Sequence, residues 1–436
     1  MSLALVSSMA VSAGNLEKAV DRSNLDTSVA PGENFYQYAC GGWMKANPLD
    51  PQYARFGTFD QLAENSREQL KNLIMNLGDN HAKGSIEQKV NDLFKMGLDS
   101  VRLNREGNAP LKADIAKLQQ LGRNGASAAI AWLHNGIANP FFESAVMADL
   151  KNSSVNLFYL CQGGLGLGDR DYYIENDANT VKVRNAYAKY VEQVLKLAGY
   201  KGGDAKKASA SVMKIETELA RVAMSREEQR DYSKQYNIYT LAQLKSDYPN
   251  IDWDAYFGGL GLSRVDKVCV MQPKSIAKVN ELMKSLKDKE LQDYLVFNYV
   301  SSAANYLSDD FIRADFDMFS KTLSGKKTMQ PRWKRSLSVP NNLLGEAVGQ
   351  LYVAKYFPPE SKKKMQELVN NLRVALGEHI ANLSWMSPKT KVNALVKLNS
   401  FTVKIGYPDK WRDYSAVSID AANSYWDNVK GAKQFE

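Results

Sequence analysis

The sequence predicts a mainly α protein with little β structure. Apolar residues recur every three or four positions in several long segments, and most of these segments begin at a residue type that caps helices. The alternation that is typical of a strand is confined to residues 141–146 and 155–160, which we expect to form a hairpin. The 436 residues are enough for about two to three domains, and no internal repeat or low-complexity linker interrupts them.

Three helices are expected in the first half of the chain. Ser85 and Gln88 have the spacing of a capping box and precede apolar residues at helical spacing, which predicts a helix over residues 86–98. A second helix is expected over residues 181–195 and ends near Gly199. A third helix is expected to begin at about Ala205, because apolar residues as far as Val222 share one helical face.

Three further helices are expected toward the C-terminus. The clearest pattern follows Pro358 and Pro359 and repeats every three or four residues as far as Leu383. Ser387 is the expected cap of the next helix, which a Gly-Tyr-Pro sequence at 406–408 would end. Ser424 is the expected cap of a last helix that passes through residue 429.

Composition and charge indicate an ordinary globular chain. Hydrophobic residues make up 44% and charged residues 24% of the sequence, which is enough apolar material to bury a core. The net charge of +8 comes from basic and acidic residues that alternate along most segments, so it predicts a solvated surface and no nucleic-acid partner. No apolar stretch is long enough for a transmembrane helix.

The histidines and cysteines exclude the common metal sites from this chain. His81, His134 and His379 lie far apart in the sequence, so no pair has the HExxH spacing. The three cysteines form no CxxC motif and are too widely spaced to indicate a disulfide framework. His379 shares the apolar stripe of the helix that follows Pro359, and we expect it at the edge of the core.

The two ends of the sequence look incomplete. Residues 3–13 are apolar and end in small residues, which resembles an export signal without its basic start. Residues 1–23 are therefore interpreted as a signal remnant with a disordered lead, and a floppy apolar terminus is the alternative. The chain stops at Glu436 in the middle of a helical pattern, so we expect the last domain to be unfinished.

A glycine-rich stretch at residues 163–168 resembles a phosphate-binding loop in composition, but the residues that follow it differ from those of such a loop. Such a loop should open an apolar helix, whereas Asp169 and Asp171 follow here and would repel phosphate. A structural turn is the favoured interpretation. The acids at 309, 310, 315 and 317 lack the glycine and terminal glutamate of a calcium loop, so we expect them to be solvated.

Residues 31–62 combine aromatic side chains with a helix start. Thr58 and Gln61 have capping-box spacing, which places Arg55 in the loop before a helix and Asp60 in its first turn. An arginine held beside such a carboxylate could present its guanidinium to the carboxylate of a peptide or an acidic ligand. A plain ion pair at the helix start explains the same residues without any ligand.

The segment 31–62 closely resembles the N-terminal signature of the neprilysin and endothelin-converting-enzyme family of zinc metallopeptidases, in its bacterial oligopeptidase form. Residues 165–173 resemble the family's LGLPxRDYY, with Gly168 where proline is common. Residues 333–335 with 341–352 resemble its W[RK]R…N…AVGxLYV stretch. Residues 383–391 and 404–409 resemble its LxWMxxxTK and KIGYPD motifs. The matches follow the family order from residue 24 to about 430.

The resemblance implies a two-lobed, largely helical enzyme in which a helical cap closes over a lobe that holds zinc. Family members bind zinc through HExxH and a downstream ExxxD, and neither motif occurs in this sequence. By resemblance, residues 24–66 form an N-terminal strip of the catalytic lobe, 67–385 the cap domain, and 386–436 a return toward the missing catalytic half. The chain alone should be inactive, and zinc is expected only in the full-length parent.

Few site residues carry over from the family. Its RxGxFD segment matches Arg55, Gly57, Phe59 and Asp60. By resemblance, Arg55, supported by Asp60, contacts the C-terminal side of a bound oligopeptide, and Phe59 lines the pocket beside the zinc. Some relatives carry a second arginine where this chain has Ala63, which puts a preference for free C-terminal carboxylates in doubt.

Two classes of function follow from these observations. The first is the N-terminal, cap-bearing part of a zinc endopeptidase that cleaves oligopeptides. The scarcity of cysteines is then typical of a bacterial, extracytoplasmic member, in the periplasm or cell envelope. The second is a self-standing helical module that binds peptides without cleaving them.

Overall fold

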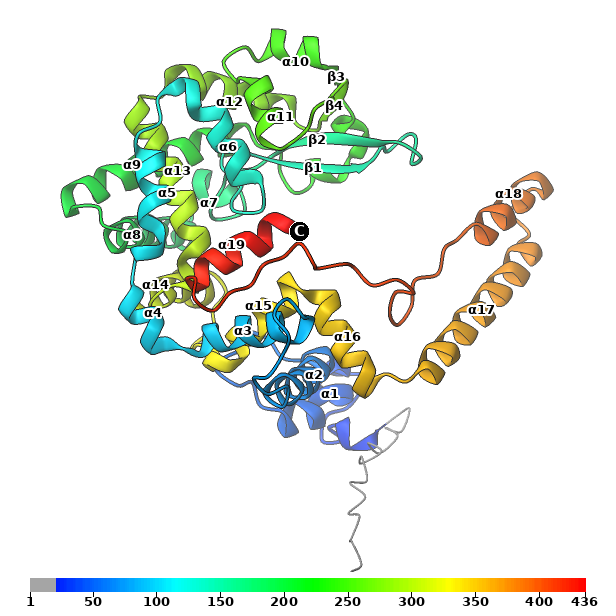
Figure 1. Cartoon of the computed structure of the whole chain (residues 1–436). Coiled ribbons are helices and arrows are strands. Elements are labelled where there is room, and N and C mark those ends of the chain that lie inside the picture. Colours follow the sequence, from blue (N-terminus) through cyan, green and yellow to red (C-terminus); the bar gives the residue numbers. More distant parts are fainter. Residues whose placement is uncertain (1–20) are drawn as a thin grey trace, which may run out of the picture. The chain divides into compact units, whose positions relative to one another are not determined.

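A computed structural model describes residues 21–436 and confirms a mainly α chain with a small sheet (Figure 1). The described residues form two compact units, one ending at Gln61 and including residues 326–328, the other formed by residues 62–325 and 329–436. The signal-like stretch 3–13 lies outside the described residues. Assignment of segments to a cap and a catalytic lobe stays a prediction. None of the described helices combines the length and apolarity needed to cross a membrane.

The first unit contains a short 3-10 helix, η1 (Arg22–Asn24), and the helix α1 (Phe35–Ala46). The helix α2 (Thr58–Met75) begins in this unit and continues into the second. Gly42 lets η1 and α1 approach closely, because a Cβ at this position would lie 2.2 Å from the backbone oxygen of Ser23.

The second unit is built mainly from helices that cover a four-stranded sheet. Its α-helices after α2 are α3 (Ile86–Leu98), α4 (Ser100–Glu106), α5 (Lys112–Gln119), α6 (Ala126–His134), α7 (Asp171–Ile174), α8 (Ala178–Leu197), α9 (Gly202–Val222), α10 (Leu241–Asp247), α11 (Trp253–Gly259), α12 (Pro273–Ser285), α13 (Asp288–Ala303), α14 (Asp309–Asp315), α15 (Arg332–Leu343), α16 (Gly345–Tyr356), α17 (Pro359–Asn382), α18 (Pro388–Asn399) and α19 (Tyr425–Phe435). A π-helix, η7 (Phe316–Leu323), continues α14. Short 3-10 turns are η2 (Ala109–Leu111), η3 (Arg123–Gly125), η4 (Glu228–Arg230), η5 (Tyr232–Gln235) and η6 (Ala304–Tyr306).

All six predicted helices are present, and three begin at the predicted caps. The hydroxyls of Ser85, Ser387 and Ser424 each accept a hydrogen bond from the backbone N–H three residues later, at 3.1–3.2 Å. The capping box at Ser85 is only half formed, because the side-chain oxygen of Gln88 accepts from the N–H of Gly84 instead of Ser85. Local caps therefore set these helix starts.

The sheet has the strand order β1-β2-β4-β3, with β1 (Phe142–Ala148), β2 (Asn156–Gln162), β3 (Ile238–Thr240) and β4 (Lys267–Val270). The expected hairpin is confirmed as the antiparallel pair β1 and β2, in which Phe142 lies opposite Gln162. The short strands β3 and β4 were not predicted from the sequence. β4 runs parallel to β2 and antiparallel to β3.

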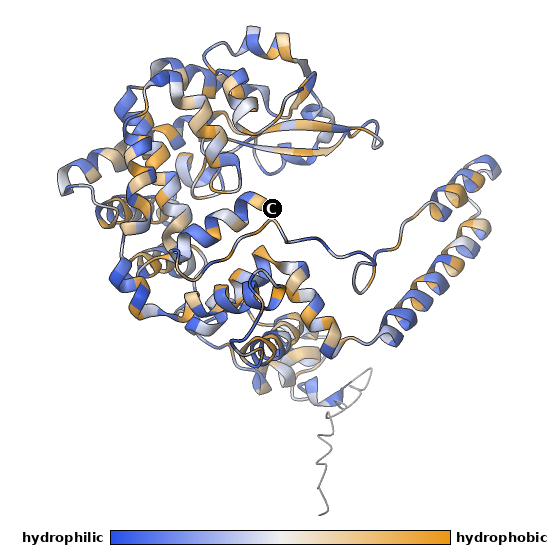
Figure 2. Ribbon diagram, viewed as in Figure 1, coloured by the Kyte–Doolittle hydropathy of each residue, from blue (hydrophilic) through white to orange (hydrophobic). Residues whose placement is uncertain are grey.

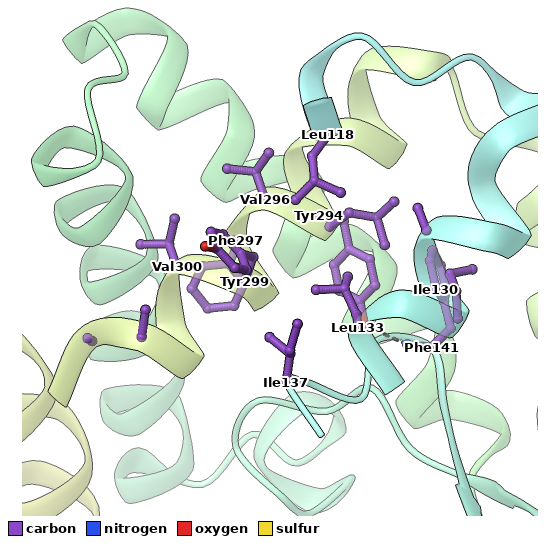
Figure 3. Close-up of a cluster of buried hydrophobic side chains, with 14 of the residues drawn as sticks. Leu118, Ile130, Leu133, Ile137, Phe141, Tyr294, Val296, Phe297, Tyr299 and Val300 are labelled. Carbon is purple, nitrogen blue, oxygen red and sulfur yellow. Dashed lines mark hydrogen bonds between the residues drawn. The ribbon is translucent and has the colours of Figure 1, made fainter. Parts of the chain in front are cut away.

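The core of the second unit lies where α5, α6 and α13 face one another (Figure 3). Phe141 joins this cluster just before β1, with its ring centroid 4.6 Å from that of Tyr294. Its φ of 68° is rare for a residue with a side chain. The strain is offset because the ring is buried and its N–H donates to the hydroxyl of Tyr294 at 3.1 Å.

The predicted helix after Pro359 forms, but its apolar stripe is exposed. α17 packs against α18, and none of its residues is buried. Figure 2 shows apolar residues along both helices. Exposed fractions reach 61% for Leu372 and 64% for Val396. The prediction that His379 lies at the core edge is wrong: His379 is exposed, because α18, which packs against its helix, leaves this residue uncovered.

Candidate functional site

The predicted contact residues Arg55, Phe59 and Asp60 all lie in the first unit, in the loop after α1 and the first turn of α2. The segment begins from a well-defined helix. The side-chain oxygen of Asn34 caps α1 by accepting from the N–H of Gln37 at 3.0 Å. The loop that carries Arg55 therefore follows a helix whose start is fixed by this cap.

Aromatic packing holds the loop that carries Arg55. The ring of Phe56 stacks on Trp43 with centroids 6.3 Å apart, and Tyr53 lies 5.2 Å from the same ring. The backbone oxygen of Pro51 accepts from the N–H groups of residues 327 and 328 at 2.9 and 3.1 Å. Arg55 is thus flanked by anchored residues on a loop with little freedom to move.

The first turn of α2 differs by one residue from the prediction. Thr58 is the first helical residue, and Gly57 occupies the cap position, with its carbonyl accepting from the N–H of Gln61 at 3.0 Å. Asp60 lies in the first turn as predicted, and its Oδ2 accepts from the N–H of Gly57 at 2.9 Å. A glycine at the cap position has no side-chain acceptor, so the Asp60 carboxylate accepts the otherwise free N–H of Gly57. The negative charge of Asp60 also interacts favourably with the positive end of the helix dipole.

Arg55 and Phe59 both point to solvent. Arg55 is exposed, and 87% of Phe59 is accessible. Within residues 21–436, no hydrogen bond or ion pair joins Arg55 to Asp60, so the expected pair between them is not formed. The segment instead presents a guanidinium and an aromatic ring, four residues apart, that are free to meet a ligand. Such a guanidinium can bind a carboxylate with two parallel hydrogen bonds.

The histidines of this chain do not fit a zinc site. His134 is half-buried, with one ring nitrogen 2.8 Å from the Tyr256 hydroxyl and the other 3.0 Å from the Pro140 oxygen. Burial lowers the pKa of His134 to about 4. His379 is exposed on α17. Among the described residues, no three His, Cys, Asp or Glu side chains are grouped so that they could hold a metal ion.

The glycine-rich stretch forms a structural turn, as predicted, over a buried glutamate. Gly168 closes the turn with an N–H bond to the Leu165 oxygen at 2.9 Å and a φ of 74°. Gly166 packs against Tyr187, where a Cβ would lie 1.8 Å from the phenolic oxygen. The N–H of Gly166 donates to the carboxylate of Glu216 at 3.2 Å. The stretch therefore has a packing role.

Glu216 is the most unusual acid in the described chain, and sequence reasoning missed it. Its side chain is fully buried and accepts hydrogen bonds from the hydroxyls of Tyr173 and Tyr187. Burial raises the pKa of Glu216 to about 7, although these hydrogen bonds oppose the shift. One sequence feature could have revealed Glu216: it lies between Val212 and Leu219 on the apolar face of the predicted helix that became α9.

The chain matches a known protein family and is similar to known proteins. Residues 31–408 match the N-terminal model of peptidase family M13. The chain is 31% identical over 420 residues to endothelin-converting enzyme 1 of Rattus norvegicus, covering 91% of this chain and 54% of that protein. Identity to the Homo sapiens enzyme is 30%, with the same shares covered. The chain thus spans about half the length of the curated relatives it matches.

The chain is also similar to solved protein structures over most of its length. The zinc metalloprotease Zmp1 of Mycobacterium tuberculosis, in complex with an inhibitor, is 30% identical with a TM-score of 0.85, over 96% of this chain and 65% of that one. PepO of Lactobacillus rhamnosis shares the fold, with a TM-score of 0.79 at 19% identity, over 93% of this chain and 65% of that one.

Proposed function

The chain belongs to peptidase family M13, and we propose that it is the N-terminal part of a zinc metalloendopeptidase that cleaves oligopeptides. The observation that carries the proposal is the family match, which runs through residues 31–408 in one continuous alignment. The Mycobacterium tuberculosis relative is a zinc metalloprotease, which supports the metal and the reaction class proposed here.

Within this function, Arg55 and Phe59 are the proposed substrate contacts. Arg55 is an exposed cation on a loop held by Trp43 and Phe56, so the backbone that carries it loses little conformational freedom on binding. Its guanidinium suits a carboxylate or carbonyl on the C-terminal side of a peptide. The exposed ring of Phe59 offers apolar area to a substrate side chain. Asp60 serves the site indirectly, because it fixes the backbone at Gly57.

The proposed partner of this chain is a C-terminal catalytic half. The apolar residues left open on α17 and α18 support it, because soluble proteins rarely expose contiguous apolar faces of this kind. The exposed members include Leu368, Leu372, Val374, Val392 and Val396. That half would also supply the zinc ligands, and bound zinc would activate the water that attacks the peptide bond. This chain alone should therefore hydrolyse nothing.

We place the proposed enzyme outside the cytoplasm, in the periplasm or cell envelope of a bacterium. The support is the signal-like composition of residues 3–13 and the small number of cysteines. The three cysteines are free in the described structure. Fractionation of cells that express the gene from its natural start, with detection by an antibody, checks this placement.

The deciding experiment compares the 436-residue chain with the product of the uninterrupted reading frame. A quenched fluorescent oligopeptide is the substrate, and both proteins are assayed with a chelator and after zinc is restored. We expect zinc-dependent hydrolysis by the longer protein and none by the chain. Hydrolysis by the pure chain that survives the chelator would overturn the proposal. A reading frame that stops at Glu436, together with peptide binding, would favour the alternative of a non-catalytic helical binding module.

A further inference from the structure

A basic cleft of about 620 Å³ lies in the second unit, whereas the segment that carries Arg55 belongs to the first unit. It opens where the end of α9 and the start of α12, which pack together, meet the residues that follow β4 and α9. Its charged lining consists of Arg170, Arg221, Lys234 and Lys274, with Glu228 as the one acid. The size falls in the range of small-molecule sites.

The four cations come from four separate segments and face one space. The pKa of Glu228 is lowered, first by the N–H of Ser225 and also by the positive charges of Arg170 and Lys234, so their fields overlap at this carboxylate. Arg221 and Lys234 have acidic neighbours only at 3.7 and 3.4 Å, in exposed pairs that solvent screens. The cleft lining itself therefore holds four cations and one carboxylate, and the acidic neighbours Glu218, Asp231 and Asp171 lie outside the lining.

Arg170 is the most ordered of the four. Its Nη1 donates to the backbone oxygen of Ala223 at 2.5 Å, which fixes the guanidinium at the cleft wall. Its Nε is buried and has no hydrogen-bond partner among the described residues, since the Asp171 carboxylate is 3.8 Å away. A buried guanidinium N–H without a partner is costly, and the positive charge of the same guanidinium lines the cleft, where it would attract an anion.

The start of α12 adds a fifth source of positive potential to the four cations. Pro273 is the first residue of this 13-residue helix, and no side chain caps its N-terminus. The amide of the cap residue Gln272 is occupied elsewhere: its oxygen accepts from the N–H of Gln162 at 2.8 Å, and its nitrogen donates to Gln235 at 2.8 Å. The helix dipole therefore adds to the field of the cations.

We propose that this basic cleft binds a small organic phosphate. The phosphoryl group would lie among Arg170, Lys234 and Lys274, and the organic body would lie against the apolar wall formed by Met224, Met271 and Pro273. A doubly charged phosphoryl group matches the excess of cations better than a single carboxylate does. The cleft shares no residue with the proposed peptide contacts, so it constitutes a second ligand site.

Titration calorimetry of the 436-residue chain tests the proposal with three probes: phenyl phosphate, inorganic phosphate and benzoate. We expect phenyl phosphate to bind with a Kd of about 1 mM or tighter. Inorganic phosphate should bind more weakly because it lacks the apolar body, and benzoate about tenfold more weakly because it carries one charge. Equal binding of phenyl phosphate and inorganic phosphate would overturn the organic-body assignment. Equal binding of benzoate would overturn the phosphoryl preference.

Paired variants locate the site without touching the core. The double variant Lys234→Gln/Lys274→Gln removes two exposed cations from the cleft and should weaken phenyl phosphate binding at least about tenfold. The matched control Lys206→Gln/Lys207→Gln removes the same charge from the exposed start of α9 and should leave binding unchanged. The same loss of affinity in both double variants, or none in the first, would overturn the site.

Discussion

The indole Nε1 of Trp426 donates a hydrogen bond to the hydroxyl of Tyr299 at 2.8 Å, inside the core of the second unit. The Tyr299 hydroxyl in turn donates to the carboxylate of Asp114 at 2.8 Å, and Lys430 binds the same carboxylate at 2.7 Å. This chain of bonds joins α19 to α13 and α5. The last described helix is therefore fixed by buried polar contacts as well as by apolar packing.

We expect Asp114→Ala to destabilise the chain by about 2–3 kcal/mol, because it leaves the Tyr299 hydroxyl without its acceptor and Lys430 with only Asp427, at 3.3 Å. The estimate is at the low end for buried pairs, since the Lys430 side chain is 19% exposed. Urea unfolding followed by circular dichroism measures the change. Lys117 also pairs with Asp114, at 3.3 Å, but its side chain is 78% exposed. Lys117→Ala should therefore cost less than about 0.5 kcal/mol, and equal losses would contradict the network.

If the proposed function holds, Arg55→Ala should reduce kcat/KM of the proposed full-length enzyme about 10- to 100-fold, because the proposed charge-assisted bond to substrate is lost. Its stability should not change, since Arg55 is exposed and bonded to no described residue. Peptide hydrolysis and thermal unfolding are measured on the same preparations. Arg264→Ala, at an exposed arginine of the second unit, is the control. Full activity of Arg55→Ala would remove Arg55 from the substrate site.

Variants at Asp60 distinguish two roles of its carboxylate: accepting a hydrogen bond from the backbone of Gly57, and acting through its charge on Arg55. Because Asp60 accepts from the N–H of Gly57, Asp60→Asn keeps an acceptor and should retain most activity. Asp60→Ala loses the bond and should cost about 1 kcal/mol of stability with some loss of activity. Steady-state kinetics of the two full-length variants make the comparison. An equal loss in both would show that the charge of Asp60 itself acts on Arg55 or on the substrate.

Glu216 should make the chain less stable as the pH rises from about 5 to about 7. Its pKa is raised by burial to about 7 in the folded state, against 4.5 as its ordinary value. Between these values the folded chain binds the extra proton and the unfolded chain does not, so stability falls as the pH increases. The loss is on the order of 3 kcal/mol, complete above the folded pKa and absent below pH 4.5.

Urea unfolding at pH 5, 6, 7 and 8 measures this dependence. Glu216→Gln cannot ionise and should lose most of the slope in that window while it keeps an acceptor for Tyr173 or Tyr187. Glu218→Gln, on the same helix but with a part-exposed side chain, should keep the wild-type slope. Identical slopes for wild type and Glu216→Gln would show that Glu216 is ionised when folded.

The open face of α17 and α18 should make the chain self-associate. Leu372→Lys/Val396→Lys places charge at two residues that are 61% and 64% exposed, so it should reduce association with little loss of stability. Light scattering and apolar-dye binding report the change. Asn370→Lys/Asn393→Lys adds the same charge to the same helices without removing apolar area. A wild-type chain that is monomeric and binds no apolar dye would contradict the prediction that the apolar face of α17 and α18 drives association.

Sequence reasoning found the candidate site but not its internal contacts. Arg55, Phe59 and Asp60 could be named from their motif, and the position of Asp60 in the first turn followed from local spacing. The partner of its carboxylate could not be predicted, because moving the helix start by one residue gives that role to the N–H of Gly57. Glu216 was missed because its tyrosine partners lie 43 and 29 residues away.

The sequence by itself determined the mainly α class, the hairpin and the capped helix starts at Ser85, Ser387 and Ser424, because caps and periodicity act over a few residues. Only the tertiary structure decided that β4 pairs in parallel with β2, across more than 100 residues, and that Glu216 is buried. It also decided that His379 is exposed, since an apolar stripe predicts a buried face only where some other element covers it. Burial depends on which distant elements meet, and local patterns do not determine that.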